Sequence, residues 1–360
     1  MQNNQTICFL NTVKTWGGGE KWHLDIATHL HSIGWSIILY VSPQSELANR
    51  AQIQKLPIRE VEIGKYSFVN PLKVMRLREY YQTDSVDTVI MNLSSDMKIG
   101  ALAAKNGRVR RIIYRRGSAI PIKNSWINQI MLKNHVTEIL ANSQATVETI
   151  FENNQNIFDQ NQVTVIPNGI DIPALEKLNQ KEPSLPLRIG NVGRLYKQKA
   201  QHYLIDLAIE LKSTQHNFVI EIVGDGVDHH KLLSLIKENN LENEVKLLGF
   251  KQDIEEFYQS LDVFVLTSVW EGFGYVLAEA MSYGVPAVAF NISSNPELIT
   301  HGINGHLVPL GDIRAIALSI DTIMKDRQRY SNAARQKVER EYAKANILYK
   351  IESYLIDKKE

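Results

Sequence analysis

The segment DVFVLTSVWEGFGYVLAEAMSYGVPAVAF, residues 262–290, indicates how this chain folds. Apolar runs at Asp262–Thr267 and Pro286–Phe290 predict two buried strands, and the stretch Tyr275–Ser282 between them predicts a helix. A strand, a helix and a second strand in close succession are typical of parallel strands joined by a helical crossover. The segment therefore predicts an α/β protein with parallel sheets.

The same alternation continues outward in both directions and forms two series. Strands are expected at Ile7–Leu10, Ser36–Val41, Thr88–Met91, Arg111–Tyr114 and Val163–Ile166, and then at Leu187–Val192, Phe218–Val223 and Val245–Leu248. Helices are expected at Glu20–His31, near Ser125, near Ala145, and at Ala200–Leu211, Asp228–Glu238 and Asp253–Ser260. The pattern predicts two Rossmann-like, doubly wound domains.

The domain boundaries are predicted from a polar stretch that contains three prolines. We expect an N-terminal domain at 1–172, a linker at 173–186 and a C-terminal domain at 187–339, with a last helix at 340–360 packing back on the first domain. Open α/β sheets bind ligands beyond the carboxyl ends of their strands, so the functional loops should face a central cleft.

Composition excludes several classes of protein. Forty basic and thirty-nine acidic side chains give a net charge of +1, which removes a global electrostatic case for a nucleic-acid partner. Cys8 is the only cysteine, so an internal disulfide and a thiolate metal cluster are excluded. The polar N-terminus and the lack of a long apolar run predict a cytoplasmic protein, attached to membranes at most peripherally.

The loop at 268–274 carries the strongest chemical signal. Glu271 lies in the loop, where it could reach a sugar hydroxyl, and Glu279 lies on the following helix. A carboxylate has two oxygens, so Glu279 could accept both hydroxyls of a ribose. Gly272 and Gly274 allow close backbone approach, and the N–H groups of the helix start could face a diphosphate.

Two further loops follow strands. In Gly193-Arg194-Leu195-Tyr196-Lys197-Gln198-Lys199, the cations Arg194 and Lys199 could together neutralise a diphosphate, although a basic loop alone is usually just solvated. In Trp16-Gly17-Gly18-Gly19-Glu20, the glycines suggest close approach to the same ligand, or simply a flexible turn. Glu20 is equally compatible with a sugar ligand and with a favourable charge at a helix N-terminus.

In this order and spacing the motifs resemble those of the retaining family 4 glycosyltransferases of the GT-B fold, in particular bacterial enzymes of lipopolysaccharide and cell-surface polysaccharide synthesis. The other matching segments are Val165–Asp171, Leu247–Phe250 and Asp262–Val265. The resemblance implies that Arg194 and Lys199 hold the donor diphosphate, that Glu271 contacts the donor sugar, and that Glu279 binds the ribose. It also implies that the donor contacts Gly17, Gly18, Gly19 and Gly193, and the backbone of Phe273, Gly274 and Tyr275. The nucleotide base is then expected near Gly249, Phe250 and Lys251.

One segment departs from the family pattern. Many relatives carry a histidine just after the strand that here reads Arg111–Tyr114, whereas this chain continues Arg115-Arg116-Gly117-Ser118. Either arginine could face the cleft on the acceptor side, as an anionic acceptor would require, and a basic surface turn explains them equally well.

The acceptor side is expected to be a glycan or a lipid-linked glycan at the cytoplasmic face of a membrane. Seven basic residues between 105 and 123 could attract an anionic bilayer: Lys105, Arg108, Arg110, Arg111, Arg115, Arg116 and Lys123. Trp126, Ile127, Ile130 and Met131 recur at helical spacing just beyond, and packing on the domain's own core explains them better than contact with lipid.

No metal or cofactor is expected. The sequence contains no Asp-x-Asp motif and no histidine spacing typical of metal ligands, so the donor should bind without a cation. By family frequency, this donor is expected to be a UDP-sugar rather than a GDP-sugar. A nicotinamide dehydrogenase is disfavoured because Tyr40-Val41-Ser42-Pro43 lacks the ribose-binding acid. An epimerase or phosphorylase on the same fold, or a non-catalytic nucleotide-sugar-binding subunit, stays open.

Overall fold

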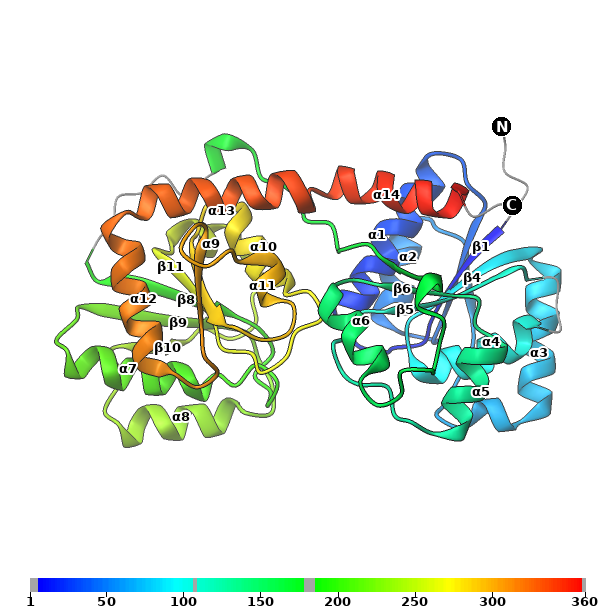
Figure 1. The fold of residues 1–360 in the computed structure, drawn as a ribbon, viewed down its shortest axis with the longest axis horizontal. Coiled ribbons are helices and arrows are strands. Elements are labelled where there is room, and N and C mark those ends of the chain that lie inside the picture. The colour runs from blue at the N-terminus through cyan, green and yellow to red at the C-terminus, as the bar shows by residue number, and fades with distance from the viewer. Residues whose placement is uncertain (1–5, 106–108, 178–184, 358–360) are drawn as a thin grey trace. The chain divides into compact units, whose positions relative to one another are not determined.

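The computed structural model describes residues 6–105, 109–177 and 185–357 (Figure 1). The chain forms two compact units, one made of Met1–Pro167 with Leu348–Glu360 and the other of Asn168–Ile347. Each unit has its own parallel sheet with helices packed around it. The α/β fold class expected from the strand and helix alternation is confirmed.

The sheet of the first unit has the strand order β3-β2-β1-β4-β5-β6-β7, and every pair in it is parallel. The strands are β1 (Thr6–Asn11), β2 (Ile37–Val41), β3 (Ile58–Glu60), β4 (Val86–Met91), β5 (Arg111–Arg116), β6 (Glu138–Ala141) and β7 (Val163–Val165). The order reverses between β1 and β4, which makes the loops after these two strands the natural ligand-binding edge.

Four helices of the first unit begin with a side-chain cap. The helices of this unit are α1 (Gly18–Ser32), α2 (Glu46–Ile53), α3 (Pro71–Thr83), α4 (Ser94–Lys105), α5 (Trp126–Asn134) and α6 (Gln144–Phe151), with short 3-10 turns η1 (Ser67–Val69) and η2 (Gln160–Gln162). The side chains of Ser45, Asn70, Ser125 and Ser143 each accept a bond from a first-turn N–H.

The C-terminal helix α14 (Lys344–Asp357) anchors to the first unit through a buried ion pair. Arg111 makes a two-pronged contact with Glu138, and its Nη1 also donates to the carbonyl of Leu355 at 2.9 Å. Tyr354 Oη donates to Glu138 Oε2 at 2.7 Å. The last turns of α14 therefore complete the hydrogen bonding of two charges inside the first unit.

The sheet of the second unit has the order β10-β9-β8-β11-β12-β13, again all parallel. Its strands are β8 (Leu187–Val192), β9 (Phe218–Val223), β10 (Val245–Leu247), β11 (Val263–Leu266), β12 (Ala287–Phe290) and β13 (Gly305–Val308). Its helices are α7 (His202–Ser213), α8 (His229–Glu238), α9 (Glu255–Ser260), α10 (Tyr275–Ser282), α11 (Asn295–Leu298), α12 (Ile313–Lys325) and α13 (Arg327–Tyr342), after the 3-10 turn η3 (Leu175–Lys177). Here the order reverses between β8 and β11.

Candidate functional site

The loops after β8 and β11 meet at the point where the strand order of the second unit reverses. Val269 N donates to the carbonyl of Gln198 at 2.9 Å, and Gln198 Nε2 donates to the carbonyl of Trp270 at 2.8 Å. Thr267 Oγ1 donates to the carbonyl of Lys199 at 2.8 Å. These bonds make the two sequence-predicted loops a single rigid platform at the carboxyl edge of the sheet.

Lys199 and Glu271 form an ion pair on this platform, with Lys199 Nζ 2.5 Å from Glu271 Oε1. Glu271 is only 6% exposed, and Ser294 Oγ donates to its main-chain carbonyl at 3.2 Å. A buried carboxylate needs such a partner, because desolvation otherwise disfavours its charged form. The structure thus brings together two residues that sequence reasoning placed on different parts of a ligand.

Arg194 lies on the same loop and is exposed. Its guanidinium has no ion pair within the described ranges, while its main-chain carbonyl accepts a bond from Gln201 Nε2 at 3.1 Å. An unpaired arginine fork on a fixed backbone can bind a phosphate through two parallel hydrogen bonds. The platform therefore offers a free cation beside a cation already paired to a carboxylate.

A Gly224-Asp225-Gly226 turn, which sequence reasoning missed, locks the Arg194 loop in place. Gly193 N donates to the carbonyl of Val223 and Leu195 N to that of Asp225, both at 2.9 Å. A Cβ on Gly224 would lie 1.9 Å from the Gly193 carbonyl oxygen, and φ there is +140°. The signal in the sequence was a Gly-x-Gly directly after a predicted strand.

Glu279 lies on α10, one turn in from the loop. Tyr258 Oη, from α9, donates to Glu279 Oε2 at 3.3 Å. Burial raises the pKa of Tyr258, and the Glu279 charge acts in the same direction, so the phenol stays a proton donor that orients the carboxylate. No feature of the sequence singled out Tyr258, because one aromatic residue on a short helix usually belongs to the core.

The start of α10 and the loop after β10 complete the site of the second unit. Gly274 heads α10 at φ +84° with no side-chain cap, so the helix N-terminus is open to an anion. Phe273 is 4% exposed and packs on Tyr275 and Tyr342, so it can offer only backbone to a ligand. Phe250, after β10, is 77% exposed and could stack on a planar group.

In the first unit, the Gly-rich loop packs tightly against the end of β4. Gly17 is the N-cap of α1, and a Cβ on Gly19 would lie 2.4 Å from Asn92 Nδ2. Glu20 is 5% exposed and accepts a bond from Asn11 Nδ2 at 3.1 Å. Glu20 is thus a buried, positioned carboxylate rather than a solvated charge at the helix start.

Arg115 and Arg116 are strand residues, since β5 extends to Arg116, and the alternative of a surface turn is wrong. Arg115 is 2% exposed, donates to Asn92 Oδ1 at 2.9 Å and lies over the ring of Trp22 at 4.4 Å. Arg116 Nη2 donates to the carbonyls of Ser118 and Ile120. Both arginines hold structure in place in this unit.

The expected basic cluster around Arg115 holds only in part, because Lys105, Arg110 and Lys123 are exposed whereas Arg111 and Arg115 are buried. Arg111 is 8% exposed and paired with Glu138, and Arg110 is paired with Asp87. Arg108 lies outside the described residues. Ile127 and Met131 pack on the core, as expected, whereas Trp126 and Ile130 are 72% and 38% exposed, so only half of the apolar stripe of α5 is a packing face.

Two buried titratable groups escaped the sequence reasoning. Asp96, on α4, accepts bonds from Thr12 Oγ1 at 2.6 Å and Thr12 N at 2.9 Å, and burial raises the pKa of its carboxyl to about 6. Burial lowers the pKa of His23 well below its usual range, and the Arg115 charge adds to this. Asp96 thus fixes the loop after β1, while the His23 ring packs against the rings of Phe9 and Trp22.

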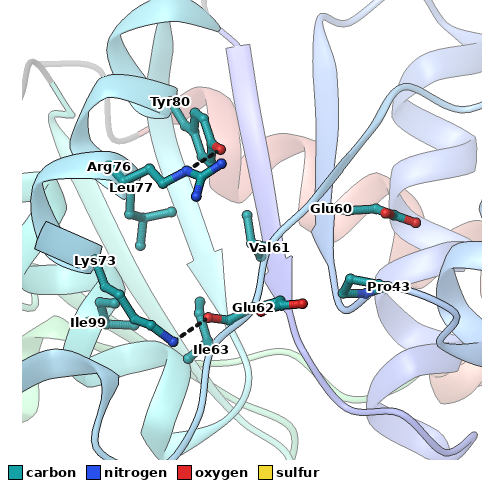
Figure 2. Close-up of a pocket in the computed structure, with 10 residues that line it drawn as sticks. All are labelled: Pro43, Glu60, Val61, Glu62, Ile63, Lys73, Arg76, Leu77, Tyr80 and Ile99. Atoms are coloured by element: carbon teal, nitrogen blue, oxygen red, sulfur yellow. Dashed lines mark hydrogen bonds between the residues drawn. The ribbon is translucent and has the colours of Figure 1, made fainter. Parts of the chain in front are cut away.

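A cavity of about 410 Å³ lies beside α3, and none of the residues expected to bind donor or acceptor lines it (Figure 2). Val61, Ile63, Leu77 and Ile99 contribute apolar surface to it. Lys73 Nζ donates to the carbonyl of Glu62 at 3.4 Å, and Arg76 Nε to Tyr80 Oη at 2.7 Å. A second hollow, of about 460 Å³, shares Pro43, Glu62, Ile63 and Lys73 and reaches Lys14 on the loop after β1.

Two family models match the chain in succession. One described as Glycosyltransferase Family 4 matches residues 16–173, and one described as Glycosyl transferases group 1 matches residues 176–340. The chain belongs to the family 4 glycosyltransferases. The matched ranges contain the Gly-rich loop, the end of β5 and the loops after β8, β9, β10 and β11, and the family expected from the motifs is confirmed.

Relatives and solved structures agree with this membership. An Escherichia coli UDP-Gal:alpha-D-GlcNAc-diphosphoundecaprenol alpha-1,3-galactosyltransferase is 34% identical over 185 residues, about half of each chain (47% of both). An uncharacterized glycosyltransferase of Haemophilus influenzae is 26% identical over 89% of this chain and 91% of its own length. The structure of Anabaena HepE in complex with UDP matches with a TM-score of 0.85 at 23% identity, covering 98% of this chain and all of HepE. These likenesses establish the GT-B fold.

Within the described residues, no group of histidine, cysteine, aspartate and glutamate side chains has the arrangement of a metal site. None of the described helices has the length and apolar character needed to span a bilayer.

Proposed function

We propose that this family 4 glycosyltransferase moves a sugar from a nucleoside diphosphate sugar to a glycan or lipid-linked acceptor, with retention at the anomeric carbon. The observation that carries the proposal is the platform at the β8–β11 reversal, where the unpaired Arg194 lies on one loop with the Lys199–Glu271 ion pair. Two cations and an open helix start suit a diphosphate, and a buried carboxylate among them suits the hydroxyls of the attached sugar.

The proposed reaction depends on stabilising the negative charge of the leaving group more than on a nucleophile from the protein. The bond between the anomeric carbon and the diphosphate breaks while the acceptor hydroxyl forms its bond to the same carbon, and the hydroxyl proton leaves with the phosphate or to solvent. Negative charge grows on the departing diphosphate, where preorganised cations lower the barrier. Arg194 and Lys199 would supply this stabilisation, so we propose that the reaction needs no divalent cation.

Glu279, oriented by Tyr258, would accept the ribose hydroxyls, and the exposed Phe250 would cover the base. A uracil nucleotide is the first choice, because the galactosyltransferase relative uses UDP-Gal by its name and HepE was solved with UDP. That relative's acceptor is a diphosphoundecaprenol-linked sugar, which supports a lipid-linked acceptor and a role in surface polysaccharide synthesis.

Isothermal titration with UDP, GDP and ADP tests the donor assignment, followed by turnover of the best nucleotide's sugars with and without acceptor. We expect UDP to bind tightest and turnover to be unchanged in EDTA. Consumption of donor sugar without any transfer would favour an epimerase, and activity lost in EDTA and restored by Mg²⁺ would contradict the metal-free mechanism.

A further inference from the structure

Four large apolar side chains are exposed within ten residues at η1 and the first two turns of α3. Tyr66 and Val69 are each 65% exposed, Leu72 is 74% exposed and Met75 is 51% exposed. We call these four residues the apolar ridge. Single exposed apolar residues are normal on a protein surface, but a local group of this size marks a contact site.

The ridge is the outer side of a well-anchored element. Asn70 Oδ1 accepts bonds from the N–H groups of Leu72 and Lys73 at 3.0 and 3.3 Å, and Pro71 sets the first helical position. Phe68 and Leu77, on the other side, pack in the core of the first unit. The exposure of the ridge is therefore a property of the folded state.

Basic side chains predominate along the segment that carries the ridge, with exposed carboxylates only beyond its two ends, at Glu62 and Glu79. Residues 65–78 include four basic side chains and no acidic one. Lys98 lies beside this segment, with its Nζ 5.6 Å from the centre of the Phe68 ring, and the charges of Lys65 and Lys123 add to burial, the larger cause, in lowering the pKa of Lys98. Lys65, Lys73, Arg76, Lys98 and Lys123 make no ion pair with a carboxylate in the described part of the chain. The basic residues at 110–115 differ, since they are paired or buried.

We propose that the apolar ridge and its surrounding lysines and arginine form a docking surface for an anionic lipid bilayer. Apolar side chains that enter the headgroup region and cations that attract anionic lipid are the two elements of interfacial binding, and α3 presents both. Lys73 and Arg76 also line the cavity of Figure 2, so the bound surface would adjoin this hollow. The proposal deepens the proposed function by naming the face that meets a membrane-bound acceptor.

Sedimentation with vesicles tests the surface directly. The full chain is mixed with vesicles of phosphatidylcholine alone, or with added phosphatidylglycerol, at low and high salt. We expect binding only to the anionic vesicles, weakened by salt. Lys73→Gln with Arg76→Gln should reduce partitioning about 25-fold, at about fivefold for each cation removed. Leu72→Ser with Met75→Ser should reduce it about tenfold or more.

A matched control carries one change of each kind on α12: Leu318→Ser, at a residue 57% exposed, with Lys325→Gln, at an exposed lysine. This control should bind vesicles like the unmodified chain, and melting temperatures should show that all variants are folded. Failure of the unmodified chain to bind anionic vesicles, or equal binding by the ridge variants, would overturn the proposal. Dimerisation lost in the ridge variants without vesicle binding would assign the face to a second copy of the chain instead. UDP titration without vesicles tests the proposed function separately.

Discussion

The two sheets present opposite kinds of polar chemistry at the same topological position. Where the second unit's strand order reverses, between β8 and β11, Arg194 is exposed and unpaired beside the Lys199–Glu271 pair. At the reversal in the first unit, between β1 and β4, Glu20 is buried and bonded to Asn11 at the end of β1, and Asn92 after β4 is bonded to the buried Arg115 of β5. One edge is prepared for an incoming anion, whereas the polar groups of the other mainly hold their own loops.

The largest expected effect is at the open edge. Arg194→Ala or Lys199→Ala should each cost about 2–4 kcal/mol of transition-state stabilisation, because each removes a charge aimed at the leaving diphosphate. Arg194→Ala should lower the melting temperature by no more than a few degrees, since Arg194 is exposed, whereas Lys199→Ala should also cost stability because it leaves the buried Glu271 carboxylate without its partner. The measurement is kcat/KM together with UDP affinity by titration. Full activity in the double variant would end the assignment of this loop.

Arg115→Ala should show the opposite pattern. Removing a buried cation that bonds Asn92 and lies over Trp22 should lower the free energy of unfolding by about 3 kcal/mol. UDP affinity should stay unchanged, because the loops that we assign to the nucleotide are in the other unit. Arg110→Ala is the matched control: its side chain is 54% exposed and paired with Asp87, so the loss should be below about 1 kcal/mol. Denaturant unfolding compares the two, and equal losses would remove the distinction.

Asp96 should make the free energy of unfolding of the first unit depend on pH. Its folded pKa of about 6 lies above the unfolded value of about 3.9, so the folded state holds this proton more tightly. The resulting stabilisation is fully present below the unfolded pKa and is lost as pH rises through about 6. Relative to Asp96→Asn, the unmodified chain should therefore lose about 2–3 kcal/mol of unfolding free energy between pH 4 and pH 7.5. Parallel stability curves for the two proteins would contradict this account.

The smallest expected effect distinguishes the proposed roles of Glu271 and Glu279. Glu279→Gln should weaken UDP binding about tenfold, as expected for the loss of one charge-assisted hydrogen-bond partner of the ribose. Glu271→Gln should leave UDP affinity nearly unchanged and reduce turnover, because we assign its carboxylate to the sugar. Titration with UDP beside turnover with the UDP-sugar makes the comparison. Equal loss of UDP affinity in both variants would argue against separate roles.

The sequence predicted the open edge better than the packed edge, for a physical reason. Arg194, Glu271 and Gly274 stand in loops directly after strong apolar runs, where position along the chain nearly determines position in space. Arg115 was placed near the right strand end, but its burial depends on Asn92 and Trp22, which approach from other elements. No local pattern encodes such a contact.

The same reasoning explains the elements that were missed. Helix α3 has an apolar ridge on its outer side as well as a buried side, so its hydrophobic periodicity is blurred. Strand β3 has three residues and none of them is buried, so it lacks the apolar run that predicts a strand. The cavity of Figure 2 lies between these two elements and could not be foreseen.

The seating of α14 on the first unit sets an order of events during synthesis. Arg111 meets the carbonyl of Leu355, a residue 244 positions later in the chain. At ribosomal speeds of about 5–20 residues per second, the nascent first unit would wait roughly 10–50 s for this partner. During that interval the Arg111–Glu138 pair lacks the cover of the final helix, so the first unit is the half that stays unfinished until translation has passed the second.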